Sequence, residues 1–282
     1  MFTTIASPAD LARHLDDPAW VVVDCRHTLQ DFAAGRAAYQ NAHVPGAFFA
    51  GVEDDLAGEK TGSNGRHPLP DPRVFAAFLA SMGVNDDTQI VAYDAGADMF
   101  AARMWFLTKW IGHDAVAVLD GGFSAWQAAG YPVTSQLPAH VQRGNISPIL
   151  RPDMNVDAEF VAEIAGSVDA TLLDARSVDR FEGRNETVDP VAGHIPGARN
   201  RFFKENFDER GRLKSPQRLR AEFEALGVPP ERIVHQCGSG VSAAVNALAM
   251  DRAGLTGWRL YPGSWSEWCA DPRRPVATGA AE

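Results

Sequence analysis

The sequence predicts an α/β fold that occurs twice in tandem, each copy being a parallel sheet with helices on both faces. The main observation is an internal repeat, because four motifs of the first half return in the same order about 142 to 151 residues later. The motifs VVVDCR (21–26), AHVPGA (42–47), IVAYDAG (90–96) and LDGGFSAW (119–126) return as TLLDAR (171–176), GHIPGA (193–198), IVHQCGSG (233–240) and YPGSWSEW (261–268). Chance matching does not reproduce both order and spacing, so we infer a duplicated domain.

The expected strands are short runs that are apolar on successive rather than alternate residues. Such runs are typical of strands covered on both faces, as in a parallel sheet. They are VVVD (21–24), IVAY (90–93) and AVAVLD (115–120) in the first half, and TLLD (171–174), IVHQ (233–236) and WRLY (258–261) in the second.

Helices are expected between these strands. Residues 72–82 and 216–226 carry apolar side chains at three- and four-residue spacing, and Gly83 and Gly227 follow as stop signals. Residues 97–110 and 241–253 follow the two central strands, the second ending at Gly254, a typical left-handed C-cap. Alternating strands and helices indicate a parallel sheet in each half.

Length and composition set the domain organisation. The 282 residues suffice for two domains with their own cores. We expect an N-terminal domain at 1–134, a linker with three prolines at 135–155, and a C-terminal domain at 156–282. The cleft between two such domains is a common place for a small-molecule site.

Charge and cysteine content exclude several classes of protein. The formal charge of −10 disfavours non-specific nucleic-acid binding, and no apolar run is long enough to cross a bilayer. The first residues lack the pattern of a signal peptide. Three cysteines without a CxxC pair disfavour a disulfide framework and a zinc site, so no metal is expected. We expect a cytoplasmic monomer.

One cysteine lies where its thiol would be chemically active. Aligning the two IV strands places Asp94 on Cys237, so one copy of the fold keeps the thiol and the other does not. Cys237 ends a strand and precedes a glycine-rich turn and a helix, IVHQ–CGSGVS–AAVNALAMDRAG. Gly238 and Gly240 let successive N–H groups curl toward the sulfur, which favours the thiolate and stabilises a negative sulfur species. Cys25 and Cys269 have no such turn and are expected to be buried hydrophobes.

The residues alone leave rival functions open. Cysteine phosphatases close a loop of this size with an arginine six residues after the cysteine, and that position is Ala243 here. Without the guanidinium a phosphate dianion lacks its main partner, which disfavours a phosphatase. A non-catalytic binding or redox-sensing module would contain a Cys237 that never accumulates transferable sulfur.

Taken together, YQNAHVPGA (39–47), GHIPGA (193–198), the CGSGVS loop (237–242) and YPGSWSEW (261–268) resemble the tandem-domain rhodaneses, a sulfurtransferase family, over essentially the whole chain. The resemblance implies two rhodanese-like domains with a catalytic C-terminal copy, Asp94 marking the non-catalytic one. It implies a ping-pong cycle in which Cys237 takes up sulfur as a persulfide, stabilised by the amides of residues 238–242, namely Gly238, Ser239, Gly240, Val241 and Ser242. The acceptor would be cyanide, a small thiol or thioredoxin, and neither metal nor organic cofactor is implied.

The resemblance also bears on the sulfur donor. Thiosulfate-type members carry basic residues after the cysteine, whereas this chain has Gly238 and Ser239. The CGSGV loop is instead similar to that of 3-mercaptopyruvate sulfurtransferases, and Arg180 matches a carboxylate-binding arginine of those enzymes. A second arginine nine residues later is replaced by Asp189, for which Arg184 is the expected substitute. Thiosulfate as the main donor is kept as the alternative.

Two further positions resemble a proton relay of the mercaptopyruvate enzymes. Ser239 matches a loop serine and His67 in GRHPLP (65–70) matches its histidine partner, with Glu53 or Asp55 as the acidic third member.

Motifs that both halves share are better explained by the fold than by catalysis. This applies to Asp174, Arg176, His194 and Trp268, which repeat Asp24, Arg26, His43 and Trp126. Trp265 faces Phe123 in the alignment and is a candidate pocket wall.

Overall fold

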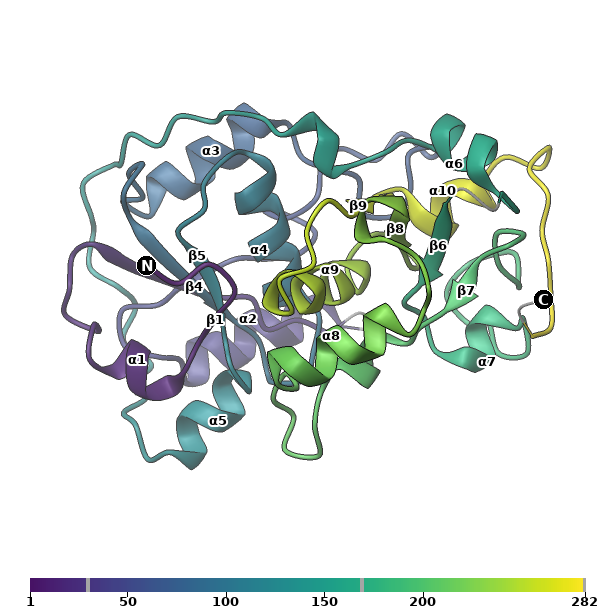
Figure 1. Ribbon diagram of the computed structural model, residues 1–282. Coiled ribbons are helices and arrows are strands. Elements are labelled where there is room, and N and C mark those ends of the chain that lie inside the picture. Colours follow the sequence, from purple (N-terminus) through teal and green to yellow (C-terminus); the bar gives the residue numbers. More distant parts are fainter. Residues whose placement is uncertain (29–30, 168–169, 281–282) are drawn as a thin grey trace. The chain divides into compact units, whose positions relative to one another are not determined.

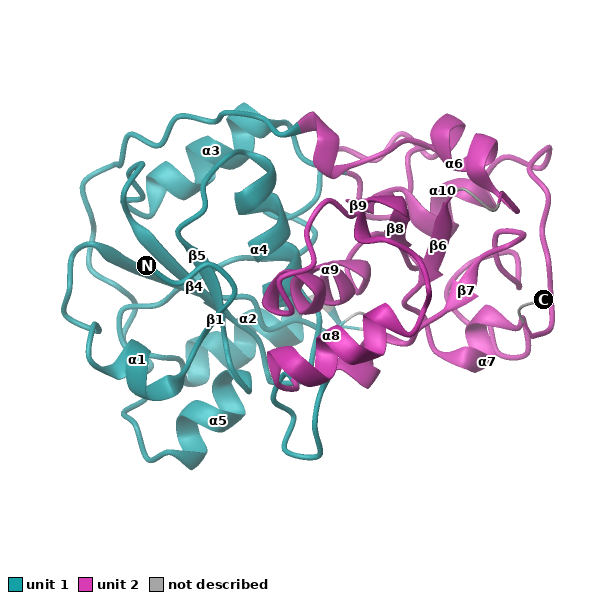
Figure 2. Cartoon of the chain, in the orientation of Figure 1, with its two compact units in different colours: residues 1–58, 69–151, 207–213 teal, residues 59–68, 152–206, 214–282 magenta. Residues whose placement is uncertain are grey.

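The computed structural model describes residues 1–28, 31–167 and 170–280 (Figure 1). The chain forms two compact units (Figure 2). Unit 1 consists of residues 1–58, 69–151 and 207–213, and unit 2 of residues 59–68, 152–206 and 214–282. Residues 59–68 lie within the range expected for the N-terminal domain, yet they pack with unit 2. The expected linker at 135–155 divides between the units after Arg151.

Unit 1 is built on a five-stranded sheet in which all neighbours are parallel. The strands follow the order β1 (Ile5–Ala6), β5 (Val116–Leu119), β4 (Gln89–Tyr93), β2 (Trp20–Asp24) and β3 (Phe48–Phe49). Every residue of β4 is buried, as the successive apolar residues predict for a central strand. The central strand therefore ends in the middle of the sheet's carboxyl edge, where Asp94 begins the loop equivalent to the cysteine turn.

Helices cover both faces of this sheet. They are α1 (Pro8–Ala12), α2 (Phe32–Asn41), α3 (Pro72–Ser81), α4 (Phe100–Trp110) and α5 (Gly122–Ala128). Leu11 of α1 and Trp126 of α5 share a core with Val91 and Tyr93, and Figure 1 shows α3 and α4 on the other face. The α3 helix begins at Pro72 because the Asp71 carboxylate caps its first N–H groups. The fold class predicted from the sequence is confirmed.

Unit 2 repeats this architecture with the parallel strand order β7 (Arg199–Asn200), β6 (Thr171–Asp174), β8 (Ile233–Gln236) and β9 (Arg259–Leu260). A single parallel bridge from Asn155 to Leu260 takes the place of the β1–β5 pairing in unit 1. The helices are α6 (Ala158–Ile164), α7 (Val178–Phe181), α8 (Pro216–Glu224), α9 (Ala243–Arg252) and α10 (Ser264–Trp268), with short 3₁₀ turns at Pro152–Met154, Phe203–Asn206 and Pro230–Arg232. The sheets thus share one strand order.

The helices after the central strands begin later than the sequence pattern suggested. The expected segments began at 97 and 241, whereas α4 begins at Phe100 and α9 at Ala243. The residues between strand and helix are used in a turn of equal length in both units. Nearly all side chains of α4 and α9 are buried. The packing of both helices therefore holds the turns at their N-termini in place.

A buried ion pair recurs at the ends of β2 and β6, which are equivalent strands of the two sheets. Arg26 donates through Nε and Nη2 to the Asp24 carboxylate and through Nη2 to the carbonyl oxygen of Ala42 at 2.5 Å. Arg176 binds Asp174 in the same way, and its Nη2 reaches the carbonyl oxygen of Gly193 at 2.8 Å. Each pair therefore ties a strand end to the His-x-Pro-Gly turn.

The histidines and tryptophans of the repeated motifs also make matching contacts. The rings of His43 and His194 stack on Tyr39 and Phe181 with centroids 4.1 and 3.8 Å apart. The indole N–H groups of Trp126 and Trp268 donate to the carbonyl oxygens of Pro132 and Pro275, both at 2.8 Å. Equal contacts in a copy without the thiol support a role for these residues in the fold.

Replacing one member of the buried pair tests this role. Arg26→Met leaves the Asp24 carboxylate buried without its cation, so we expect the free energy of unfolding to fall by about 3 kcal/mol. The matched control is Arg13→Ala, which removes an exposed pair with Asp10 and should cost less than about 1 kcal/mol. Urea unfolding followed by circular dichroism measures both, and equal losses would contradict the assignment.

Candidate active site

The Cys237 sulfur accepts hydrogen bonds from two backbone N–H groups of the turn at the carboxyl end of β8. The N–H of Gly240 donates to Sγ at 3.1 Å, and that of Ser239 does so at 3.5 Å. The N–H of Cys237 itself donates to the hydroxyl of Ser264 at 3.1 Å. With the start of α9 just beyond, the turn presents a concentration of partial positive charge to the sulfur. This is the arrangement expected for a site that stabilises an anion.

The turn is held in this shape by α10 and by one glycine. The carbonyl oxygens of Cys237 and Gly238 accept the N–H groups of Trp265 and Ser266, at 3.0 and 2.9 Å. Gly240 has φ of +74°, and a Cβ at that position would lie 2.5 Å from the carbonyl oxygen of Pro262. Glycine is therefore required there both for its conformation and for the close approach of the Pro262 backbone.

Unit 1 fills the equivalent turn with a carboxyl group. Asp94 Oδ1 accepts the N–H of Gly96 at 3.1 Å, and Oδ2 accepts that of Ala101 in the first turn of α4 at 3.0 Å. Its carbonyl oxygen accepts the N–H of Phe123 at 2.8 Å, as Cys237 does from Trp265. Burial raises the pKa of Asp94, and these N–H groups oppose the rise. The anion-binding turn is thus kept in unit 1 but occupied by the chain itself.

The other two thiols lie in unreactive surroundings. Burial raises the pKa of Cys25 well above its usual value, and the carboxylates of Asp24 and Asp94 raise it further. Burial also raises the pKa of Cys269. Both cysteines are buried, as the sequence predicted, and neither is followed by a turn of N–H groups.

Ser239 and His67 are brought together although 172 residues separate them. A hydrogen bond of 2.7 Å joins His67 Nδ1 to Ser239 Oγ, and both side chains are buried. The segment 59–68 packs closely on the loop before α10, because Gly65 has no side chain to separate its backbone from that of Gly263. Glu53 and Asp55 belong to unit 1 and His67 to unit 2, so the acidic third member of the relay stays a prediction.

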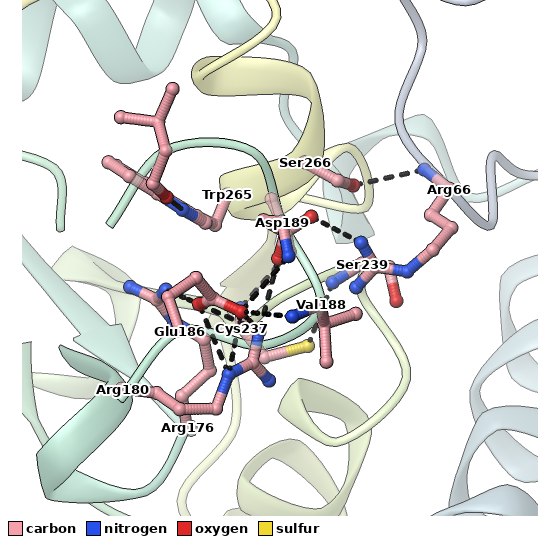
Figure 3. A network of polar contacts seen from close by, with 12 residues as sticks. Arg66, Arg176, Arg180, Glu186, Val188, Asp189, Cys237, Ser239, Trp265 and Ser266 are labelled. Atoms are coloured by element: carbon pink, nitrogen blue, oxygen red, sulfur yellow. Dashed lines mark hydrogen bonds and ion pairs between the residues drawn. The ribbon is translucent and has the colours of Figure 1, made fainter. Parts of the chain in front are cut away.

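Beside the thiol turn lies a network of arginines and carboxylates, which Figure 3 shows from close by. Arg180 of α7 donates through Nε and Nη2 to Glu186 at 2.8 to 3.2 Å and through Nη2 to Asp189 at 3.1 Å. Arg66 pairs with the other oxygen of Asp189 through Nη1. Arg176 approaches Glu186 at 3.5 Å. The side chains of Glu186 and Asp189 are each only 2% exposed, so both carboxylates depend on these cations.

The same network keeps Glu186 ionised. Burial alone would raise the pKa of Glu186, but the hydrogen bonds from Arg180 and from the N–H groups of Asp189 and Val188 outweigh it and lower that pKa. The turn at 186–189 is therefore a charged support for the arginines.

Two guanidinium groups end directly above the thiol turn. A Cβ placed on Gly238 would lie 3.1 Å from Arg66 Nη2 and 3.7 Å from Arg180 Nη1. Within the described part of the chain, neither of these nitrogens has a carboxylate or carbonyl acceptor. The residue after Cys237 is thus faced by N–H donors open to an anionic ligand.

The structure gathers most of the residues singled out from the sequence. The thiol turn with Ser239, His67 and Arg180 comes together, whereas the Arg184 side chain is 64% exposed and pairs with Glu182. Arg66 was missed, although its place directly before His67 in Gly-Arg-His offered a signal. Glu186 was also missed, although it lies three residues before Asp189 in the stretch NETVD (185–189). Trp265 is fully buried and contacts Arg176, so it has no surface exposed to a pocket.

Two negative findings apply to the described ranges of the chain. No helix there has the length and apolar character to span a membrane. The same residues include no cluster of three or more His, Cys, Asp or Glu side chains arranged to hold a metal ion.

The thiol turn at the end of the central strand of a duplicated parallel-sheet domain agrees with the sulfurtransferase class that the sequence suggested. The family model "Rhodanese-like domain" matches residues 7–129 and 157–271, and the chain belongs to this family. The "Probable 3-mercaptopyruvate sulfurtransferase" of Pseudomonas aeruginosa is 45% identical over 95% of this chain and 96% of its own length. The thiosulfate sulfurtransferase of Cricetulus griseus is 35% identical over 86% of this chain and 84% of its own length.

Solved structures agree with this membership. The crystal structure of SseA from Escherichia coli, a 3-mercaptopyruvate sulfotransferase with the rhodanese fold, is 33% identical and superposes with a TM-score of 0.81. It covers 94% of this chain and 100% of that one. The tandem organisation and the enzyme class expected from the sequence are confirmed.

Replacing Gly240 tests whether the shape of the turn controls the thiol. We expect Gly240→Ala to slow alkylation of Cys237 by iodoacetamide at neutral pH by about tenfold, because the displaced N–H no longer stabilises the thiolate. Gly227→Ala is the matched control, since Gly227 has a similar φ of +70° but open space at its Cβ position. The control should lose only about 1 kcal/mol of stability, with unchanged alkylation. Equal alkylation rates in both variants would contradict the role of the turn.

Proposed function

We propose that this enzyme transfers sulfur from 3-mercaptopyruvate, through a persulfide on Cys237, to a thiophilic acceptor. The observation that carries the proposal is the convergence of the Arg66 and Arg180 guanidinium groups over Gly238, beside the thiol turn. A small α-keto acid carries a carboxylate and a carbonyl at one end and a thiol at the other. The N–H groups of Arg66 and Arg180 that face Gly238 suit the carboxylate. Cys237, which directly precedes Gly238, is then placed to react with the thiol end.

In the first half-reaction the C–S bond of the donor breaks, and the electrons of that bond stay with the carbon. The Cys237 thiolate attacks the sulfur of 3-mercaptopyruvate, an S–S bond forms, and the C–S bond breaks to give the enolate of pyruvate. The proton that leaves the donor's thiol is returned to the enolate carbon, so that pyruvate and a persulfide anion result. The Ser239–His67 hydrogen bond supports a relay that carries a proton in this step.

The persulfide is stabilised by the turn itself. The N–H groups of Ser239 and Gly240 already point at Sγ. In unit 1 the Asp94 carboxyl reaches one bond further, to the first-turn N–H of Ala101, whose counterpart after Cys237 is that of Ala244. By this comparison the outer sulfur of the persulfide is within reach of the α9 N-terminus. Gly238, Val241 and Ser242 complete the turn.

The second half-reaction passes the outer sulfur to an acceptor. Cyanide, a small thiol or a reduced thioredoxin attacks the outer sulfur, the S–S bond breaks, and Cys237 leaves as the thiolate. A cytoplasmic monomer is the working form that we propose. The cycle needs no organic cofactor, because sulfur serves as both nucleophile and leaving group.

The persulfide step is tested by mass spectrometry of the intact protein. After incubation of the reduced protein with 3-mercaptopyruvate, we expect a gain of one sulfur atom that cyanide removes. Cys237→Ser should show no such gain, whereas Cys269→Ser, at a buried and unreactive thiol, should match the unmodified protein. A cyanide-labile sulfur that persists in Cys237→Ser would exclude the proposal.

The carboxylate contact is tested by comparing two arginines of the same segment. We expect Arg180→Ala to lower kcat/KM for 3-mercaptopyruvate about 30- to 100-fold, the loss typical of a charge-assisted contact. The exposed Arg184→Ala should change it less than about twofold. Steady-state pyruvate release measures both. Similar values for the two variants would show that the donor's carboxylate is not bound by Arg180.

A further inference from the structure

Charges at the donor end of the site cancel within the protein. Three arginines, Arg66, Arg176 and Arg180, meet three carboxylates, and each carboxylate is directly paired with at least one of them. The carboxylates are those of Asp174, Glu186 and Asp189. The formal charge of this group is therefore zero before a donor binds. A donor is attracted by local N–H groups rather than by an excess of positive charge.

The three carboxylates differ in what surrounds them. The Asp174 carboxylate is paired with Arg176 in the buried ion pair of the fold. The Glu186 carboxylate also accepts two backbone N–H groups of its own turn. Asp189 instead bridges the ends of Arg66 and Arg180, whose remaining N–H groups face Gly238. Its negative charge is thus placed next to the position where the donor's anionic group would bind.

We propose that Asp189 is a specificity-determining residue that makes the site select a monoanionic sulfur donor over a dianionic one. The inference rests on the proposed function, because it names the charge class of donor that the same site accepts. An α-keto thiol such as 3-mercaptopyruvate carries one negative charge at neutral pH, and thiosulfate carries two. Asp189 repels the second about twice as strongly as the first, since a Coulomb energy scales with the donor's charge.

Asp189 also has a positioning role that must be separated from this repulsion. Its carboxylate binds both Arg66, from the segment 59–68, and Arg180, from α7, and so holds the two guanidinium groups side by side. Loss of that positioning would weaken the binding of both donors alike. A change in charge selectivity shifts the ratio between them, which a purely structural role does not.

The test measures binding of thiosulfate and of pyruvate, a dianion and a monoanion, to the unreactive Cys237→Ser protein. Adding Asp189→Asn should raise the ratio of thiosulfate to pyruvate affinity by about tenfold, and this gain should shrink as salt screens the charges. Asp189→Glu keeps the charge and should keep the original ratio. Glu163→Gln, which removes an exposed charge on α6, is the matched control and should leave the ratio unchanged.

A second variant keeps the test decisive if Asp189→Asn does not fold. Arg66→Gln removes the opposite charge beside the same site and should lower the ratio by a similar factor. An unchanged ratio in the folded variants would overturn the role of Asp189. Turnover by the otherwise unaltered enzyme is measured separately. If 3-mercaptopyruvate is not turned over while the binding ratio shifts as expected, the proposed donor is wrong and the charge selection stands.

Discussion

The chemistry of this protein depends on a six-residue turn whose backbone N–H groups point at one sulfur atom. The turn keeps this shape because α10 binds its first two carbonyl oxygens and because Gly240 lets the Pro262 backbone approach. The fixed dipoles of these N–H groups direct positive potential at the sulfur without any side-chain cation in the turn. In unit 1 the equivalent turn directs two N–H groups at the Asp94 carboxyl group, so this arrangement of N–H groups is a property of the backbone that both units share.

Duplication separates the requirements of the fold from those of catalysis. The buried Asp–Arg pairs, the stacked histidines and the hydrogen bonds of the two tryptophan indoles recur with nearly equal geometry in both units, including unit 1, whose turn has Asp94 in place of the cysteine. What differs lies in the loops at the carboxyl ends of the strands. There unit 2 gains Cys237, the segment 59–68 and the charged turn at 186–189. The internal comparison therefore serves as a control that a single-copy enzyme does not offer.

Beside the thiol turn, the positive charges of three arginines are balanced by the negative charges of three carboxylates. The side chains of Glu186 and Asp189 are almost completely buried, and the arginines that pair with them offset the cost of burying their charges. The arginines are in turn held with some N–H groups paired and others directed at Gly238. For the proposed donor, this pre-organisation lowers the entropy lost when its carboxylate binds. The same arrangement would place that carboxylate beside Gly238, the residue that follows Cys237.

The sequence by itself determined the fold class, the duplication, the burial of Cys25 and Cys269, and the position of a cysteine turn expected to work with Ser239, His67 and Arg180. These follow from local patterns, since apolar runs, glycine positions and helix starts depend on neighbouring residues. The tertiary structure decided which distant side chains meet. It brought Arg66 rather than Arg184 to the turn, and it packed residues 59–68 with unit 2. Such contacts depend on how long loops close in space, and no short-range periodicity records where a loop side chain ends.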